Sequence, residues 1–155
     1  MIAGVPVPVI LMLLILGLTH FILSFTPLGS YIYAIGGNEE TARLSGVKVN
    51  RIKSIVYLIS GLYTGISGLI LAGRLGSAQP NTGEGFELDA IAAVVLGGTS
   101  LMGGRGSVWG TLIGVFIIGI LNNGFNLLNV SPFYQLIAKG IVIIFAVLLD
   151  QILKR

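Results

Sequence analysis

A short charged segment between two apolar stretches carries the residues best suited to act outside a membrane. Asn38 is a favourable helix N-cap, and Glu39 and Glu40 follow it where acidic side chains complement the helix dipole. Gly46 is a natural helix stop, because glycine readily adopts the left-handed conformation. The pattern predicts a capped helix of about two turns. This helix either contacts a cytosolic partner or is an ordinary solvated helix.

A glycine-rich segment, residues 97–107, superficially resembles a phosphate-binding loop. It lacks the Gly-x-x-x-x-Gly-Lys-Ser/Thr spacing and follows no strand of an α/β unit, so we exclude nucleotide binding there. Glycine permits positive φ and close backbone approach, and irregular backbone survives at membrane depth only where protein or water covers it. We interpret the segment as a tight turn between packed helices, with a gate as the alternative.

A row of amides lies further along the chain. Asn122, Asn126 and Asn129 fall at i, i+4 and i+7, so they share one face of a helix. Such a row can hydrogen-bond the hydroxyl groups of a solute, or it can join neighbouring helices. Because polar residues inside membrane spans mark candidate pathways, Asn122 and Asn126 are the predicted lining residues.

The other ionisable residues suggest no catalytic or metal site. His20 is the only histidine and cysteine is absent, so no metal cluster or thiol chemistry is expected. No nucleophile and base stand at a credible spacing, which argues against an intramembrane enzyme, and no cofactor is expected. Lys139 and Asp150 are interpreted as interfacial anchors of one helix. Three acidic residues are interpreted as an external loop that meets a binding protein or is simply solvated: Glu84, Glu87 and Asp89.

The composition indicates an integral membrane protein. The 155 residues are 54% apolar and only 10% charged, with a mean hydropathy of +0.96. Soluble domains are about 25% charged, and bilayer spans need about 20 predominantly apolar residues. The positive charges are divided among loops rather than gathered on one face, so the expected partner is a lipid bilayer and not nucleic acid.

The apolar stretches predict an all-α, polytopic transmembrane helix bundle with about five crossings. The expected spans are residues 5–25, 54–72, 88–104, 108–128 and 133–149. A polar loop is expected over residues 30–53 and a second, turn-rich loop over residues 73–89. Two sets of glycines predict close helix packing: Gly61, Gly65 and Gly68 in one span, and Gly110, Gly114 and Gly119 in another.

The distribution of lysine and arginine predicts the orientation. With five crossings, the loop at residues 30–53 and the carboxyl terminus lie in the cytoplasm, and only Arg74 and Lys139 remain on the outer side. If residues 88–104 only re-entered the membrane, Lys154 and Arg155 would lie outside, so we favour a crossing. The amino terminus then lies outside without a signal sequence, which suggests that the natural chain begins further upstream.

One long motif resembles a known family. Residues 31–50, Tyr-Ile-Tyr-Ala-Ile-Gly-Gly-Asn-Glu-Glu-Thr-Ala-Arg-Leu-Ser-Gly-Val-Lys-Val-Asn, resemble the signature cytoplasmic loop of the ribose and related monosaccharide ABC importer permeases. The resemblance continues through residues 77–80, 85–101, 103–106, 110–114 and 121–128. It covers nearly the whole chain as the carboxyl-terminal portion of one importer transmembrane domain, since family chains are about twice this length.

This resemblance implies a permease subunit of a sugar importer in the bacterial inner membrane, with ATP hydrolysis on a partner. The implied partners are an ABC ATPase subunit, a second permease copy and a periplasmic or extracellular sugar-binding protein. By matching position, the residues coupling to the ATPase are Gly36, Gly37, Asn38, Glu39, Ala42, Arg43, Leu44 and Gly46. The chain departs from the family at Pro27 and Ser30, where similar proteins usually carry arginines. A passive channel or a structural membrane protein is the alternative.

Overall fold

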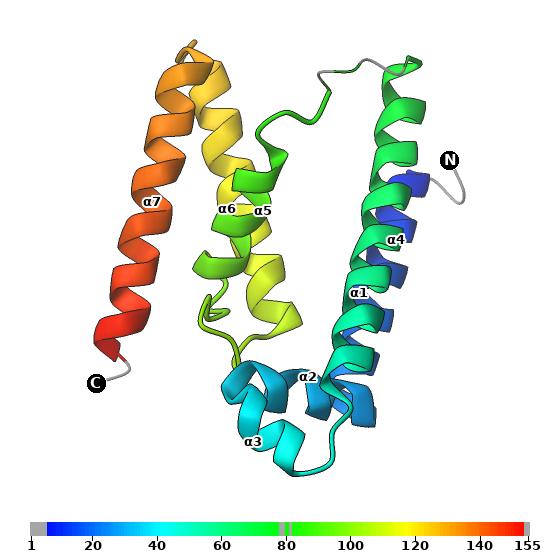
Figure 1. Ribbon diagram of the computed structural model, residues 1–155. Helices are drawn as coiled ribbons and strands as arrows, with labels where there is room; N and C mark the ends of the chain where they lie inside the picture. Colours follow the sequence, from blue (N-terminus) through cyan, green and yellow to red (C-terminus); the bar gives the residue numbers. More distant parts are fainter. Residues whose placement is uncertain (1–5, 78–79, 81, 154–155) are drawn as a thin grey trace. The chain divides into compact units, whose positions relative to one another are not determined.

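The structure is a computed structural model that describes residues 6–77, 80 and 82–153, with side chains up to residue 148. Every regular element in these residues is an α-helix (Figure 1). The helices are α1 (Val7–Phe25), α2 (Pro27–Gly37), α3 (Glu39–Leu44), α4 (Val49–Leu75), α5 (Phe86–Leu96), α6 (Val108–Leu127) and α7 (Pro132–Leu153). The chain divides into two compact units, residues 1–82 and 83–155, which are described separately.

Among the described residues, three helices are long and apolar enough to cross a membrane: α1, α4 and α6. The described apolar part of α7, Pro132–Leu148, is shorter. Large apolar side chains cover the outside of these helices; Leu14 on α1 is 64% exposed and Leu69 on α4 is 76% exposed. Such surfaces are stable in lipid rather than in water. The structure therefore confirms the predicted polytopic membrane fold of helices.

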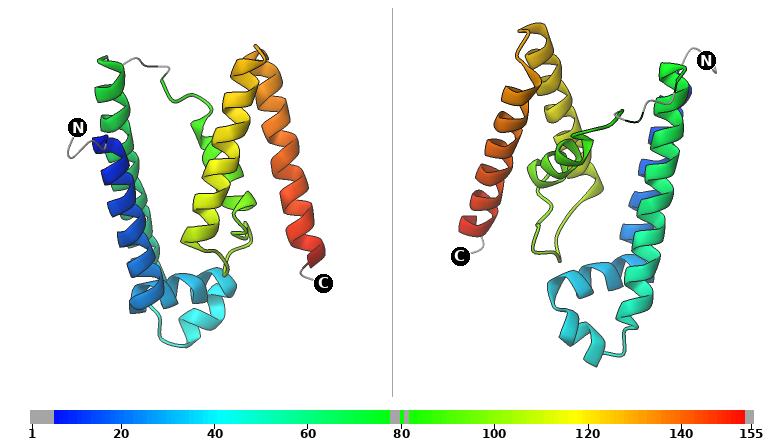
Figure 2. Two further views of the ribbon diagram at one scale, coloured as in Figure 1. Left: turned by 180° about the vertical axis from the view of Figure 1, so that it is seen from behind. Right: turned by 45° about the horizontal axis from the view of Figure 1, so that its top comes forward.

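In the first unit, α1 and α4 run side by side, and α2 and α3 join their ends (Figures 1 and 2). The hydroxyl of Thr19 on α1 donates a hydrogen bond of 3.1 Å to the Tyr63 hydroxyl on α4. The chain turns sharply between α1 and α2, where a Cβ added at Gly29 would lie 2.2 Å from the Leu23 carbonyl oxygen. Only glycine allows this approach, so the corner depends on Gly29.

The segment at residues 30–53, expected as a polar loop with one short capped helix, contains more helix than expected. Helix α2 occupies the first part of this segment, and α4 begins at Val49, five residues before the expected span. Pro27 follows the end of α1 at Phe25 and lies in the first turn of α2. Proline has no amide hydrogen to lose there, so it starts a helix as readily as it ends one.

In the second unit, α5 packs against both α6 and α7, and its backbone touches that of α6. A Cβ at Gly114 would lie 1.9 Å from the Ala93 carbonyl oxygen, and one at Gly110 would lie 2.0 Å from the Gly97 carbonyl oxygen. The pairing of 93 with 114 and of 97 with 110 makes α5 and α6 antiparallel, as the views in Figures 1 and 2 agree. A small buried core forms from Ala92, Ala93 and Ile118, with Leu96 and Ile143 against it.

The expected span over residues 88–104 is helical only in α5. Its 11 residues measure about 16 Å, roughly half of a 30 Å hydrocarbon core. The chain then leaves the helix because Gly98, Gly103 and Gly104 adopt positive φ values of 81°, 87° and 76°. The two boundaries of the expected loop over residues 73–89 were also misplaced, because α4 continues to Leu75 and α5 begins at Phe86.

The prediction of close packing holds for two of the six glycines. Gly110 and Gly114 mediate the close contact of α6 with α5, as predicted. A Cβ at Gly61, Gly65, Gly68 or Gly119 would meet no atom within 4 Å. These four positions therefore mediate no close packing among the described residues.

Candidate coupling site

One residue makes the corner between α2 and α3. Asn38 has extended backbone angles, with φ −156° and ψ 108°, so it ends α2 and begins α3. Its side-chain oxygen accepts a 2.9 Å hydrogen bond from the Thr41 amide, while its own amide donates to the Ala34 carbonyl at 3.0 Å. The side chain thus satisfies one of the amides left unpaired at a helix start. The predicted N-cap is confirmed.

The carboxyl end of α3 is closed by two hydrogen bonds. The Gly46 amide donates to the Arg43 carbonyl at 3.0 Å, and the Val47 amide donates to the Ala42 carbonyl at 3.1 Å. Gly46 has a φ of 86°, the left-handed conformation that this Schellman arrangement requires. The predicted stop is confirmed, and α3 is a short helix with defined caps at both ends.

Glu39 fastens α3 to α4. Its carboxylate lies 3.0 Å from the Arg43 guanidinium one turn along α3 and 2.5 Å from Lys53 Nζ on α4. The hydrogen bond from Lys53, together with the nearby positive charge of Lys53 and Arg43, holds the pKa of Glu39 below its ordinary value. Both ion pairs are exposed, so each contributes little stability by itself. Of the two, only the pair with Lys53 links α3 to the start of α4.

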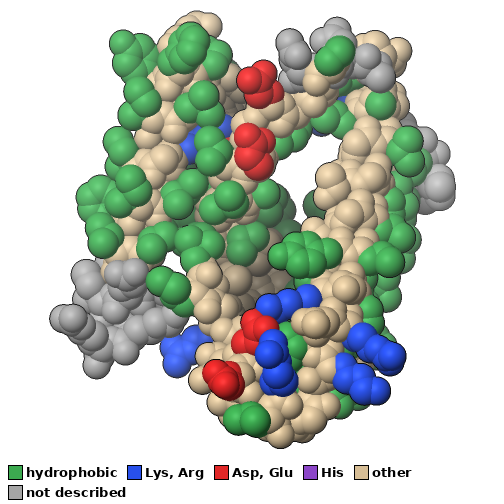
Figure 3. All heavy atoms as spheres, in the orientation of Figure 1, with side chains coloured by type: hydrophobic (Ala, Val, Ile, Leu, Met, Phe, Trp, Pro, Cys, Tyr) green, Lys and Arg blue, Asp and Glu red, His purple; other side chains and the backbone are tan. Residues whose placement is uncertain are grey.

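The same region has a charged surface with one prominent apolar side chain. Figure 3 shows lysine, arginine and acidic side chains gathered over α3 and the start of α4. Leu44 at the end of α3 is 84% exposed, whereas Ala42 on the opposite face is 5% exposed. Leu44 therefore lies on the outer face of α3 and is accessible to another protein.

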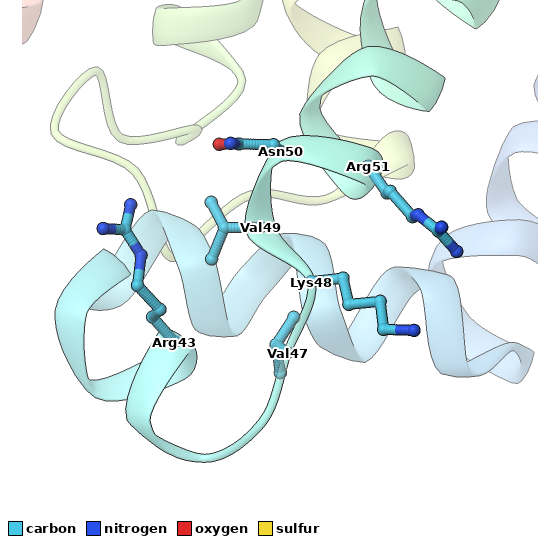
Figure 4. A pocket seen from close by; sticks show the side chains of 6 residues that line it. All are labelled: Arg43, Val47, Lys48, Val49, Asn50 and Arg51. Carbon is cyan, nitrogen blue, oxygen red and sulfur yellow. The ribbon is translucent and has the colours of Figure 1, made fainter.

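A cleft of about 280 Å³ lies where α3 meets α4 (Figure 4). Arg43 borders it from α3, while Lys48 and Arg51 extend together toward another side of the α4 start. Its lining residues are Arg43, Val47, Lys48, Val49, Asn50 and Arg51. The combination of basic groups and valines suits a partner surface with both acidic and apolar side chains.

The structure brings the eight predicted coupling residues together and leaves the predicted lining residues in the other unit. Gly36 and Gly37 end α2, Asn38 makes the corner, and the remaining five lie on α3 or in its stop. Asn122 donates a hydrogen bond of 2.9 Å to Asp89, and Asn126 accepts one of 3.4 Å from Gln135. Each amide therefore has a partner in the chain. Asn129 lies beyond the end of α6 at Leu127 and has a φ of 52°, so it does not share the helix face predicted for the three amides.

Sequence reasoning missed two polar contacts. Lys53 was placed in the polar loop, and its pairing with Glu39 was not predicted, because it joins two different helices. Asp89 was placed in a solvated loop and Lys139 at the interface, yet they pair at 2.6 Å between α5 and α7. Charges within or beside apolar stretches commonly pair with one another, which is the signal for this contact.

Comparison with known proteins places the chain in a family of membrane transport components. The family described as "Branched-chain amino acid transport system / permease component" matches residues 1–147, and the chain belongs to it. The ribose import permease protein RbsC of Bacillus subtilis (strain 168) is 61% identical over 148 residues, which cover 96% of this chain and 46% of that protein. RbsC of Escherichia coli (strain K12) is 58% identical over 148 residues, 96% of this chain and 46% of that protein.

The xylose transport system permease protein XylH of Escherichia coli (strain K12) is 51% identical over 152 residues, 98% of this chain and 39% of that protein. No solved structure matches the chain. The chain therefore spans about half the length of the relatives it matches. The family and these relatives confirm the resemblance drawn from the loop motif, and the chain is a multi-pass membrane component of transport systems.

Proposed function

We propose that this chain forms part of the transmembrane domain of an ATP-driven monosaccharide importer, with α3 as the helix that contacts the ATPase. The observation that carries the proposal is the pair of properties of α3. The helix is capped at both ends and attached to α4 through Glu39, yet it exposes Leu44 almost fully. A fixed helix with an exposed apolar side chain can transmit a partner's movement to the span that follows.

The substrate proposed is ribose or a related monosaccharide. The support is similarity: two of the relatives above are named ribose permeases and one a xylose permease. The description of the whole family names branched-chain amino acids instead. The individual relatives, at 51–61% identity, are named for ribose or xylose. Asn122 and Asn126 remain proposed lining residues, because amide groups bond sugar hydroxyls and lie on the membrane-spanning helix α6.

The proposed complex also contains a second permease copy and a sugar-binding protein. The proposed location is the bacterial inner membrane, with α3 and the carboxyl terminus in the cytoplasm. Four cations gather at α3 and the start of α4, namely Arg43, Lys48, Arg51 and Lys53, and such clusters favour the cytoplasmic side. We also propose that this chain is the carboxyl-terminal portion of one transmembrane domain, which it forms together with the rest of a longer permease.

A graft tests the proposal. This chain replaces the matching segment of the Bacillus subtilis ribose permease, and ATP-dependent ribose uptake is measured in cells that contain the other importer subunits. We expect uptake by the graft and its loss in Leu44→Ser. The matched control is Leu75→Ser, because Leu75 is also exposed, at 51%, and lies at the opposite end of α4.

The outcomes separate importer from channel. Equal uptake by the Leu44→Ser and Leu75→Ser grafts would remove α3 from energy coupling. Ribose equilibration that needs no ATP would favour the passive channel. A graft that reaches the membrane but transports xylose and not ribose would keep the importer and change only its substrate.

A further inference from the structure

Three helices of the second unit contribute one polar side chain each to a single cluster. Lys139 Nζ on α7 lies 2.6 Å from Asp89 Oδ1 on α5, and Asn122 Nδ2 on α6 donates 2.9 Å to Asp89 Oδ2. The side chains of Lys139 and Asp89 are only 13% and 20% exposed. Both carboxylate oxygens of Asp89 thus have a positive or donating group beside them.

The cluster lies within the length of the membrane-spanning helix. The 20 residues of α6 measure about 30 Å, the thickness of a hydrocarbon core. Asn122 precedes the end of α6 at Leu127 by five residues, or about 7.5 Å. Asp89 is therefore inside the span and not in the solvated loop where its sequence position suggested.

The cluster faces a packing problem that is specific to α5. This helix has only 11 residues, and it is followed by a glycine-rich turn instead of a second helical half. Its buried apolar core is small: Ala92 and Ala93 of α5 lie with Ile118 of α6, and Leu96 and Ile143 pack against them. In lipid, apolar surface gains little from leaving the solvent, so interhelical polar bonds and close packing must hold helices in place.

We propose that Asp89, Lys139 and Asn122 form an interhelical latch that seats α5 between α6 and α7. Lys139 and Asn122 are positioning residues in this account, and neither needs to touch a transported solute. The seating of α5 stands independently of the transported substrate. The claim that transport needs this latch rests on the proposed function.

Removing one charge of the pair has unequal consequences. Without Lys139, the carboxylate of Asp89 is uncompensated at membrane depth and is too short to reach water. Without Asp89, the long side chain of Lys139 can extend toward the interface. Removing both charges leaves a neutral site. A single substitution should therefore do more harm than the double, because an unpaired buried charge costs more than a missing pair.

Cysteine alkylation measures the seating. The chain has no cysteine, so a single one at Ala92, which is 0% exposed, reports whether α5 is seated. In membranes of cells making the grafted permease, we expect Ala92→Cys to react slowly with N-ethylmaleimide. Lys139→Met should raise the rate about tenfold, Asp89→Asn should raise it less, and the double variant should return to within about twofold of the parent. Lys139→Arg should keep the parent rate.

Controls keep the result specific to the latch. Glu87→Gln neutralises an exposed acid in the same first turn of α5 and should leave the rate unchanged. If Ala92→Cys does not accumulate, the near-isosteric Ser100→Cys, 6% exposed in the turn after α5, serves as the reporter. The inference is overturned if Lys139→Met leaves the rate unchanged, or if the double variant reacts as fast as the faster single one.

Uptake in the same membranes separates the two proposals. Loss of uptake in Lys139→Met, with recovery in the double variant, supports the latch as a requirement for transport. Lost uptake with a still-protected cysteine would contradict a positioning role. A parent graft that transports no sugar at all would count against the proposed function, while the alkylation rates would still decide the latch.

Discussion

Replacing Gly114 by alanine should push α5 away from α6. A Cβ at this position would lie 1.9 Å from the Ala93 carbonyl oxygen, whereas ordinary contacts begin at 3.4 Å. The two backbones must therefore separate by about 1.5 Å, and no flexible side chain can absorb the change because the neighbour is backbone. The same contact holds Ala93 in the small core of the second unit.

The magnitude follows from overpacking. Extra methyl groups in a tight interior cost about 1–3 kcal/mol, and a rigid backbone neighbour argues for the upper end. For a chain of 155 residues, about 3 kcal/mol corresponds to a fall in Tm of roughly 6–12 °C. Gly119→Ala on the same helix is the matched control, because a Cβ there meets nothing within 4 Å. It should be neutral or slightly stabilising, since alanine favours helix.

The measurement is thermal unfolding of the purified chain in detergent, followed by circular dichroism. We expect the Tm of Gly114→Ala to lie well below that of the parent and that of Gly119→Ala at or above it. Equal Tm values for the two variants would refute the close backbone contact between α5 and α6. They would also remove the packing basis for the antiparallel arrangement.

Two further predictions concern α3. Asn38→Ala removes the cap on the Thr41 amide, and Gly46→Ala places a Cβ at a φ of 86°. Each substitution should destabilise α3 by about 1 kcal/mol and speed amide hydrogen exchange in this helix. Unchanged exchange would contradict the cap geometry. Lowering the pH should also loosen α3. Because the folded-state pKa of Glu39 is below its ordinary value of 4.5, the bond to Lys53 is intact above pH 4.5 and is lost as the pH falls through the folded-state pKa. Exchange in α3, corrected for the intrinsic effect of pH, should accelerate in that range in the parent and show no such step in Glu39→Gln.

The sequence predicted the features that depend on local composition. Long apolar stretches located α1, α4 and α6, because a span needs only length and apolarity. Asn38 and Gly46 located α3, because caps act within one helical turn. The family resemblance pointed to the segment that the structure makes a charged, exposed corner.

The sequence did not predict the features that depend on which residues of other elements a residue contacts. Gly29 makes a close backbone contact with Leu23 and Pro27 begins α2, and neither role was predicted. Asp89 and Lys139 are fifty positions apart, and their pairing depends on the register of α5 against α7. Spacing along one chain does not define that register, so the latch became visible only in three dimensions.

Crosslinking from position 44 tests most directly whether α3 contacts an ATPase. A cysteine replaces Leu44 in the grafted permease, whose grafted segment has no cysteine of its own, and a second variant carries it at Leu75. We expect crosslinking of position 44, but not of position 75, to the ATPase subunit, with a yield that changes between the ATP-bound and nucleotide-free states. If position 44 and its neighbours react with aqueous thiol reagents but never crosslink to the ATPase, α3 is not the coupling helix.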